Sequence, residues 1–156
     1  GRLVVTGLNI TLPAHWASAI YGPAGFFAPT GELRVSAEHI EIDHGGLHGD
    51  AEILWNNAGG RFTGIPQLGD YRLALNGQGE IANFGLSTLS GSLDLTGNGQ
   101  WRVAGDGQIT FKGTAAARAD HAQLGPLLET FGRDLGDGRR PLAFSMRAPL
   151  VTLLGL

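Results

Sequence analysis

The chain contains no cysteine, so its chemistry excludes disulfide bonds, thiol nucleophiles and thiolate-bound metals. Lysine occurs once, and the 11 basic residues are outnumbered by 14 acidic residues. The net charge of −3 argues against binding of a nucleic-acid backbone as the main task. No apolar run reaches the roughly 18 residues that a membrane-spanning helix needs.

Glycine, in contrast, is abundant: it supplies 26 of the 156 residues, against a usual share of roughly 7%. The glycines follow no third-position period, which excludes collagen. Leu, Ile, Val and Phe make up about 27% of the chain, above the roughly 20% below which disorder is typical. A chain of this length buries enough surface for one domain, which we expect to span residues 1–156.

Apolar and polar residues alternate with a period of two along much of the chain, which is typical of strands with one buried face. The run that begins at Glu32 alternates to Ala37 and changes phase at Ile40, which predicts a β-bulge. The expected strands are residues 2–12, 32–42, 47–55, 71–76, 92–96, 100–104, 108–117 and 142–148.

Glycine-containing sequences separate these runs. Glycine tolerates the positive φ that tight hairpins require, so we expect turns at these positions. The predicted turns are residues 45–46, 77–79, 97–99 and 105–107. The pattern as a whole indicates an all-β, mainly antiparallel fold, a curved glycine-rich meander sheet or half-pipe.

Two segments break the strand pattern. Residues 12–20 predict a short helical turn or a loop. Residues 120–131 predict the one substantial helix, with Asp120 and Gln123 as a capping box and Gly132 as its end. We expect its apolar stripe to pack on the sheet and plug one end of it. The stripe consists of Leu124, Leu127, Leu128 and Phe131.

One stretch of the chain, residues 39–50, combines three histidines with several carboxylates. Such groups can bind Zn²⁺, but their spacing matches no standard metal motif. We therefore interpret the stretch as a solvated hairpin tip and expect neither a metal nor another cofactor. The residues concerned are His39, Glu41, Asp43, His44, His48 and Asp50.

Nothing in the sequence pairs a nucleophile with a base, so we expect no catalytic residues and no enzymatic activity. Gly105 and Gly107 resemble the start of a dinucleotide-binding loop, but a strand follows where phosphate binding needs a helix. None of the serines stands in a Gly-x-Ser-x-Gly elbow.

Arginines gather at the exit of the predicted helix. Arg133, Arg139 and Arg140 stand beside Asp134 and Asp137. Two interpretations are open: a contact with an acidic partner or lipid headgroup, or a solvated loop with local ion pairs, which we favour.

Several motifs in the second half of the chain follow one another in a distinctive order. They are LSGSLDLTGNGQW at 89–101, FKGTAAA at 111–117, LGPLL at 124–128, FG at 131–132 and DGRRPLAF at 137–144. Their order and spacing resemble the C-terminal half of protein N of the bacterial type II secretion system. The membrane span expected near the N-terminus of that family is not in this sequence, and we expect it upstream of Gly1.

This resemblance implies a non-enzymatic accessory component anchored in the inner membrane, with its soluble part in the periplasm. The expected partners are other secretion components, in the inner-membrane platform or the secretin. The family has no catalytic motif, so the resemblance assigns no site residue, and the partner-binding residues stay unknown. The alternative function is a periplasmic lipid-binding half-pipe, similar to lipid-bridge proteins. The two differ in whether the helix closes the apolar face or leaves an open groove.

The edges of the expected sheet carry little charge. We expect the strand at 2–12 to be one edge and the run near 142–154 to be the other. Arg2 is the only charge in residues 1–12, and Arg147 is the only one in residues 141–156. Weakly protected edges favour the addition of a partner strand or self-association, which supports the interaction module over the lipid carrier.

Overall fold

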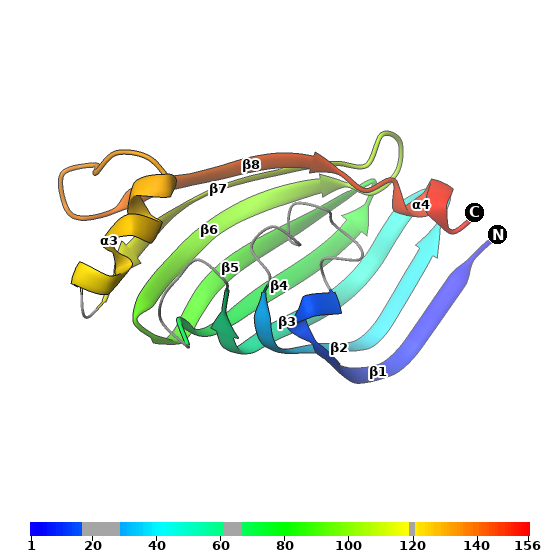
Figure 1. Ribbon diagram of the computed structural model, residues 1–156. Helices are drawn as coiled ribbons and strands as arrows, with labels where there is room; N and C mark the ends of the chain where they lie inside the picture. The colour runs from blue at the N-terminus through cyan, green and yellow to red at the C-terminus, as the bar shows by residue number, and fades with distance from the viewer. Residues whose placement is uncertain (17–28, 61–66, 119–120) are drawn as a thin grey trace.

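A single antiparallel sheet of eight strands dominates the fold of the computed structural model, which describes residues 1–16, 29–60, 67–118 and 121–156 (Figure 1). Each strand pairs only with its neighbours in sequence, in the order β1 to β8, so the sheet is an unclosed meander. The predicted all-β, antiparallel fold is confirmed. The strands are β1 (Leu3–Pro13), β2 (Thr30–Asp43), β3 (Gly46–Gly59), β4 (Gly69–Gly79), β5 (Ile81–Gly91), β6 (Leu93–Arg102), β7 (Gln108–Ala117) and β8 (Arg140–Arg147).

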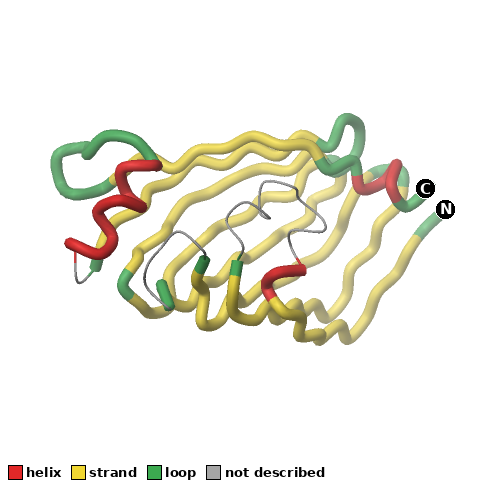
Figure 2. Tube along the Cα trace, viewed as in Figure 1, coloured by secondary structure: helices red, strands yellow, loops and turns green. Residues whose placement is uncertain are grey.

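Short helical segments flank the sheet. The 3₁₀ helix η1 (Ala14–Trp16) follows β1, while α3 (His121–Thr130) and α4 (Leu150–Leu153) lie at opposite ends of the curved sheet (Figure 2). Helix α3 confirms the helix predicted at 120–131, and Gly132 follows it with a φ of 125°. Asp120, the side chain of Gln123 and residues 17–20 of the predicted N-terminal turn lie outside the described residues.

The core is divided between the two ends of the sheet. At one end, Leu124 and Leu128 of α3 pack with Leu93 of β6 and with Ala115 of β7. At the other end, residues of α4 pack against a cluster built on β2, β3 and β5. Both helices lie on the same face of the sheet. Trp101 of β6 packs against the same cluster as α4, and Leu93 of β6 packs with α3. Because side chains alternate along a strand, Trp101 and Leu93 point to the same face of β6.

Strand alternation gives the sheet one apolar and one polar face. One rung of paired residues crosses six strands with apolar side chains, interrupted by a single glycine; it runs Ala51, Leu75, Phe84, Gly99, Phe111, Phe144. The next rung is polar throughout and runs Asp50, Asn76, Asn83, Gln100, Thr110, Ser145. The predicted bulge is confirmed, since the pairing of β2 with β3 shifts register between Ser36 and Ile40.

Four details of the expected pattern of strands and turns are wrong. Residues 81–91 form the strand β5, which the prediction omits, although Phe84 and Leu86 alternate with polar or small residues there. Residues 97–99 do not form the expected turn, because β6 runs unbroken from Leu93 to Arg102. Gly97 and Gly99 instead leave room for side chains that pack closely against that strand. The turn expected at residues 77–79 is also wrong, because these residues belong to β4. The last strand ends at Arg147, and α4 occupies much of the run expected to continue the edge.

Candidate functional site

An apolar groove of about 440 Å³ runs across the face of the sheet on which the helices pack. Side chains from β2 to β8 line it, all of them apolar, among them Ile53, Leu73 and Leu86. The volume falls in the range of about 300–1,000 Å³ that is usual for small-molecule sites. Because one groove touches seven successive strands, this face is the concave side of the curved sheet.

Stacked aromatic rings form part of the lining. The ring of Phe111 lies 6.1 Å from that of Phe84 and 5.2 Å from that of Phe144, centroid to centroid, in near-parallel planes. The rings approach the backbone of β6 closely at two glycines. A Cβ at Gly97 would stand 2.5 Å from Cζ of Phe111, and one at Gly99 would collide with the ring of Phe84. Glycine is therefore required at these positions to let the rings lie against the sheet.

The helices close the ends of this face and leave its middle uncovered among the described residues. Leu124, Leu127 and Leu128 of α3 are buried at one end. Leu150 and Val151 of α4 pack at the other. Between them, Phe144 in the groove is 44% exposed. The predicted plug is confirmed for one end of the sheet, and the apolar face between the plugs is an open groove.

Arg140 stands at the α3 end of the groove. It precedes Leu142 by two residues on β8, so it shares the groove face, and it pairs with the buried Ala115. Its Nη1 donates a hydrogen bond of 3.0 Å to the carbonyl oxygen of Gly132. Its Nε is buried without a hydrogen-bond partner in the part of the chain that the structure describes.

The loop between α3 and β8 holds the other arginines. Asp134 accepts hydrogen bonds from the N–H groups of Gly136 and Gly138, which lower the pKa of its carboxyl, with a further contribution from the charge of Arg140. Arg139 lies 3.5 Å from a carboxylate oxygen of Asp137. The local ion pair expected for a solvated loop is present there. Arg140, however, lies on the sheet and faces the groove.

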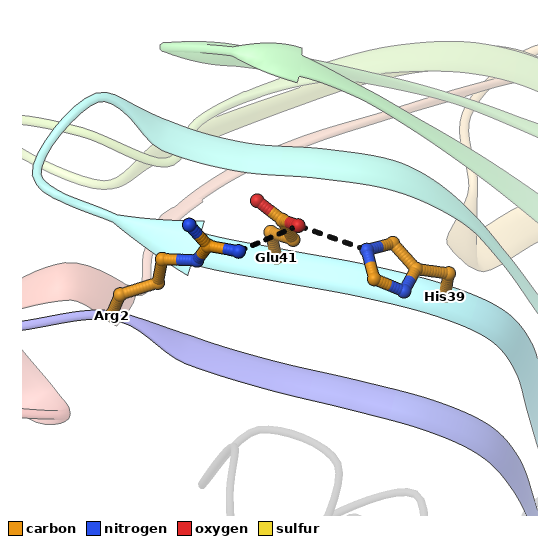
Figure 3. Close-up of polar contacts among 3 residues, drawn as sticks. All are labelled: Arg2, His39 and Glu41. Carbon is orange, nitrogen blue, oxygen red and sulfur yellow. Dashed lines mark hydrogen bonds and ion pairs between the residues drawn. The ribbon is translucent and has the colours of Figure 1, made fainter.

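The histidine-rich stretch forms the hairpin of β2 and β3, as predicted. Figure 3 shows Arg2, just before β1, and His39 of β2 converging on the carboxylate of Glu41. The distances to that carboxylate are 3.1 Å from Arg2 and 3.0 Å from His39. The hydrogen bond with His39 is the main cause that lowers the pKa of Glu41. Among the described residues, no group of three or more His, Asp or Glu side chains is placed to hold a metal ion.

The two edge strands differ in their protection. β1 has 11 residues, and its apolar side chains Leu3, Val4 and Ile10 are about 40% exposed. β8 has 8 residues, with Pro141 near its start and an arginine at each end. Since proline and charge protect sheet edges from further pairing, β1 is the less protected edge.

The architecture therefore defines a class of domain: an open β half-pipe with an apolar inner face and two unpaired edges. The chain belongs to the family described as type II secretion system (T2SS), protein N, whose model matches residues 1–143. It is thus a component of type II secretion, a protein-transport system of the cell envelope. Comparison with curated proteins and with solved structures gives no significant match.

No helix among the described residues is long and apolar enough to cross a membrane. The hairpin, the α3 stripe and the edges were predicted from the sequence, whereas an open apolar groove was predicted only as the alternative to a closed face. Phe84 carries the missing signal, since its alternation with Asn83 and Gly85 places one more apolar row on the face shared by Leu75 and Phe111.

Proposed function

We propose that residues 1–156 form one periplasmic domain of a membrane-anchored secretion component, and that this domain is a non-enzymatic assembly module. Membership of the protein N family supports a place among the other secretion components. The partner is a protein of the inner-membrane platform or the secretin, and a second copy of the chain is a further partner of the same kind.

The observation that carries the proposal is the free edge of β1. Within the part of the chain that the structure describes, its 11 residues pair with β2 on one side only, from Leu3 to Pro13. Arg2 is the sole charge in residues 1–12, and it is engaged with Glu41 of β2. A long edge with so little protective charge is suited to accept an added strand, whose main-chain hydrogen bonds supply affinity.

The test places lysine on this edge. Thr6→Lys combined with Ile10→Lys should weaken binding to the periplasmic parts of platform or secretin proteins by tenfold or more, measured by titration calorimetry. Ser145→Lys on β8 is the control and should bind like the unchanged chain. Sedimentation of the same proteins measures self-association. Equal binding and equal sedimentation for all three chains would refute the role of the β1 edge.

A further inference from the structure

The lining of the groove suits an apolar ligand surface. All its lining side chains are apolar, and the one with an N–H group, Trp101, donates that hydrogen bond to the carbonyl oxygen of Ala148 at 2.9 Å. An extended peptide lying there would leave its own N–H and C=O groups unpaired, which is costly in an apolar environment. A hydrocarbon chain has no such groups to satisfy, and its burial is favourable in proportion to its area.

The α3 end of the groove adds a positive charge. Arg140 lies on the groove face, with Nη1 bonded to Gly132 and Nε buried and unpartnered. None of the ion pairs among the described residues includes its guanidinium. Its charge contributes to the lowered pKa of Asp134, whose carboxylate is engaged by two backbone N–H groups. Because the guanidinium lies outside these ion pairs, its positive charge suits an anionic oxygen, with which its hydrogen bonds are charge-assisted.

We propose that the groove binds an acyl chain of a membrane phospholipid and that Arg140 binds the anionic headgroup of that lipid. The apolar lining and the guanidinium of Arg140 at the α3 end form an amphipathic site of matching polarity. The site is separate from the β1 edge, so the domain can take up lipid and add a partner strand independently. The ligand class that follows is an anionic phospholipid, preferred over a zwitterionic one with the same chains.

The first experiment measures headgroup choice. The chain is incubated with vesicles of phosphatidylcholine and phosphatidylglycerol in equal amounts, re-isolated, and its bound lipid is quantified by mass spectrometry. We expect phosphatidylglycerol to be enriched about tenfold, the effect of one charge-assisted hydrogen bond. Arg140→Gln should bring the ratio close to one, whereas Arg140→Lys should keep most of the preference. Lys112→Gln removes a charge from the opposite face and should change nothing.

The second experiment measures the groove itself with a matched pair on β5. Leu86 lines the groove, and the adjacent Ser87 is exposed on the other face, opposite Arg72. Leu86→Glu should abolish uptake of both lipids, while Ser87→Glu should leave it unchanged. Circular dichroism confirms that each variant is folded. Thr6→Lys should retain full uptake, so failure of the β1 proposal and failure of this one are distinguishable.

The results that would overturn the proposal are specific. Recovery of no phospholipid from the unchanged chain would exclude the groove as a lipid site. Equal loss of lipid from Leu86→Glu and Ser87→Glu would place binding elsewhere. A phosphatidylglycerol ratio that is the same in Arg140→Gln as in the unchanged chain would remove the headgroup role of Arg140.

Discussion

The two faces of the sheet are built from alternate residues of the same strands, yet the side chains on the two faces make different kinds of contact. On the polar face, Nδ2 of Asn76 donates to Asp50 at 2.5 Å, and Gln100 donates to Asn83 at 3.2 Å. On the concave face, the side chains have only one another, as in the stack of Phe84, Phe111 and Phe144. The polar side chains hydrogen-bond to one another, whereas among the described residues no second layer covers the middle of the apolar face.

Most domains cover the apolar face of a sheet with a second layer of helices or strands. In the part of this chain that the structure describes, α3 and α4 cover only the two ends of that face. The contrast indicates that stability is concentrated at the ends, where Leu124 is fully buried. The middle, where Phe144 is 44% exposed, contributes less to stability and remains free for a ligand.

Truncation of the plug should give the largest effect. Leu128→Ala removes a side chain that is 5% exposed and should lower the free energy of unfolding by about 2–5 kcal/mol. Phe144→Ala in the groove should cost less than Leu128→Ala, because 44% of that residue is already exposed to water. Urea midpoints of the two variants test the comparison. Equal losses would mean that the middle of the face is packed as tightly as its end.

Adding a methyl group beneath the aromatic stack should give the second-largest loss of stability. Gly97→Ala places a Cβ 2.5 Å from Cζ of Phe111 and should cost about 1–3 kcal/mol through overpacking. Gly125→Ala is the control, because a Cβ there meets no atom within 4 Å and the residue lies inside α3. It should change the stability less than Gly97→Ala does, because the higher helix propensity of alanine is offset by its position before Pro126. If both variants were neutral in thermal unfolding, the stack would not be held against β6.

The smallest expected effect is on the polar face, where the pKa of Glu41 makes the stability depend on pH. The pKa of Glu41 is lowered, chiefly by the hydrogen bond with His39 and further by the charge of Arg2. A lowered folded-state pKa means that Glu41 stabilises the fold above its unfolded pKa and loses this contribution as pH falls through the folded value. His39→Ala should raise the pKa of Glu41 more than Arg2→Ala does, as measured by NMR titration. The reverse order would assign the shift to charge instead of the hydrogen bond.

Much of the fold could be predicted because its strands are amphipathic and its connections are short. The bulge near Ile40 and the helix at α3 both follow from local periodicity. The strand β5 was predictable from the alternation of Phe84 and Leu86 with polar or small residues. The unbroken course of β6 was not, because the role of Gly97 and Gly99 depends on Phe111 and Phe84 in neighbouring strands. Glycine that makes room for a ring and glycine that makes a turn look the same in a sequence.

The groove was less accessible to prediction than the edges. The charges along one strand show how well it is protected as an edge. For β1, the sequence alone shows that Arg2 is the only charged residue in residues 1–12. A groove exists only if the second layer is incomplete, which depends on how far α3 and α4 extend over the face. The position of Arg140 on the groove face also required the register of β8, since its neighbours Arg133 and Arg139 lie in the loop before that strand.

The most direct test of an open, lipid-binding apolar face uses two adjacent residues of β8. Ala143 and Phe144 are both exposed and point to opposite faces, and the chain has no cysteine of its own. Single variants Ala143→Cys and Phe144→Cys are labelled with a maleimide in the presence and absence of phosphatidylglycerol vesicles. The account predicts rapid labelling of both variants without lipid, and protection of only Phe144→Cys when lipid is added. Slow labelling of Phe144→Cys in the lipid-free chain, or equal protection of the two variants, would contradict it.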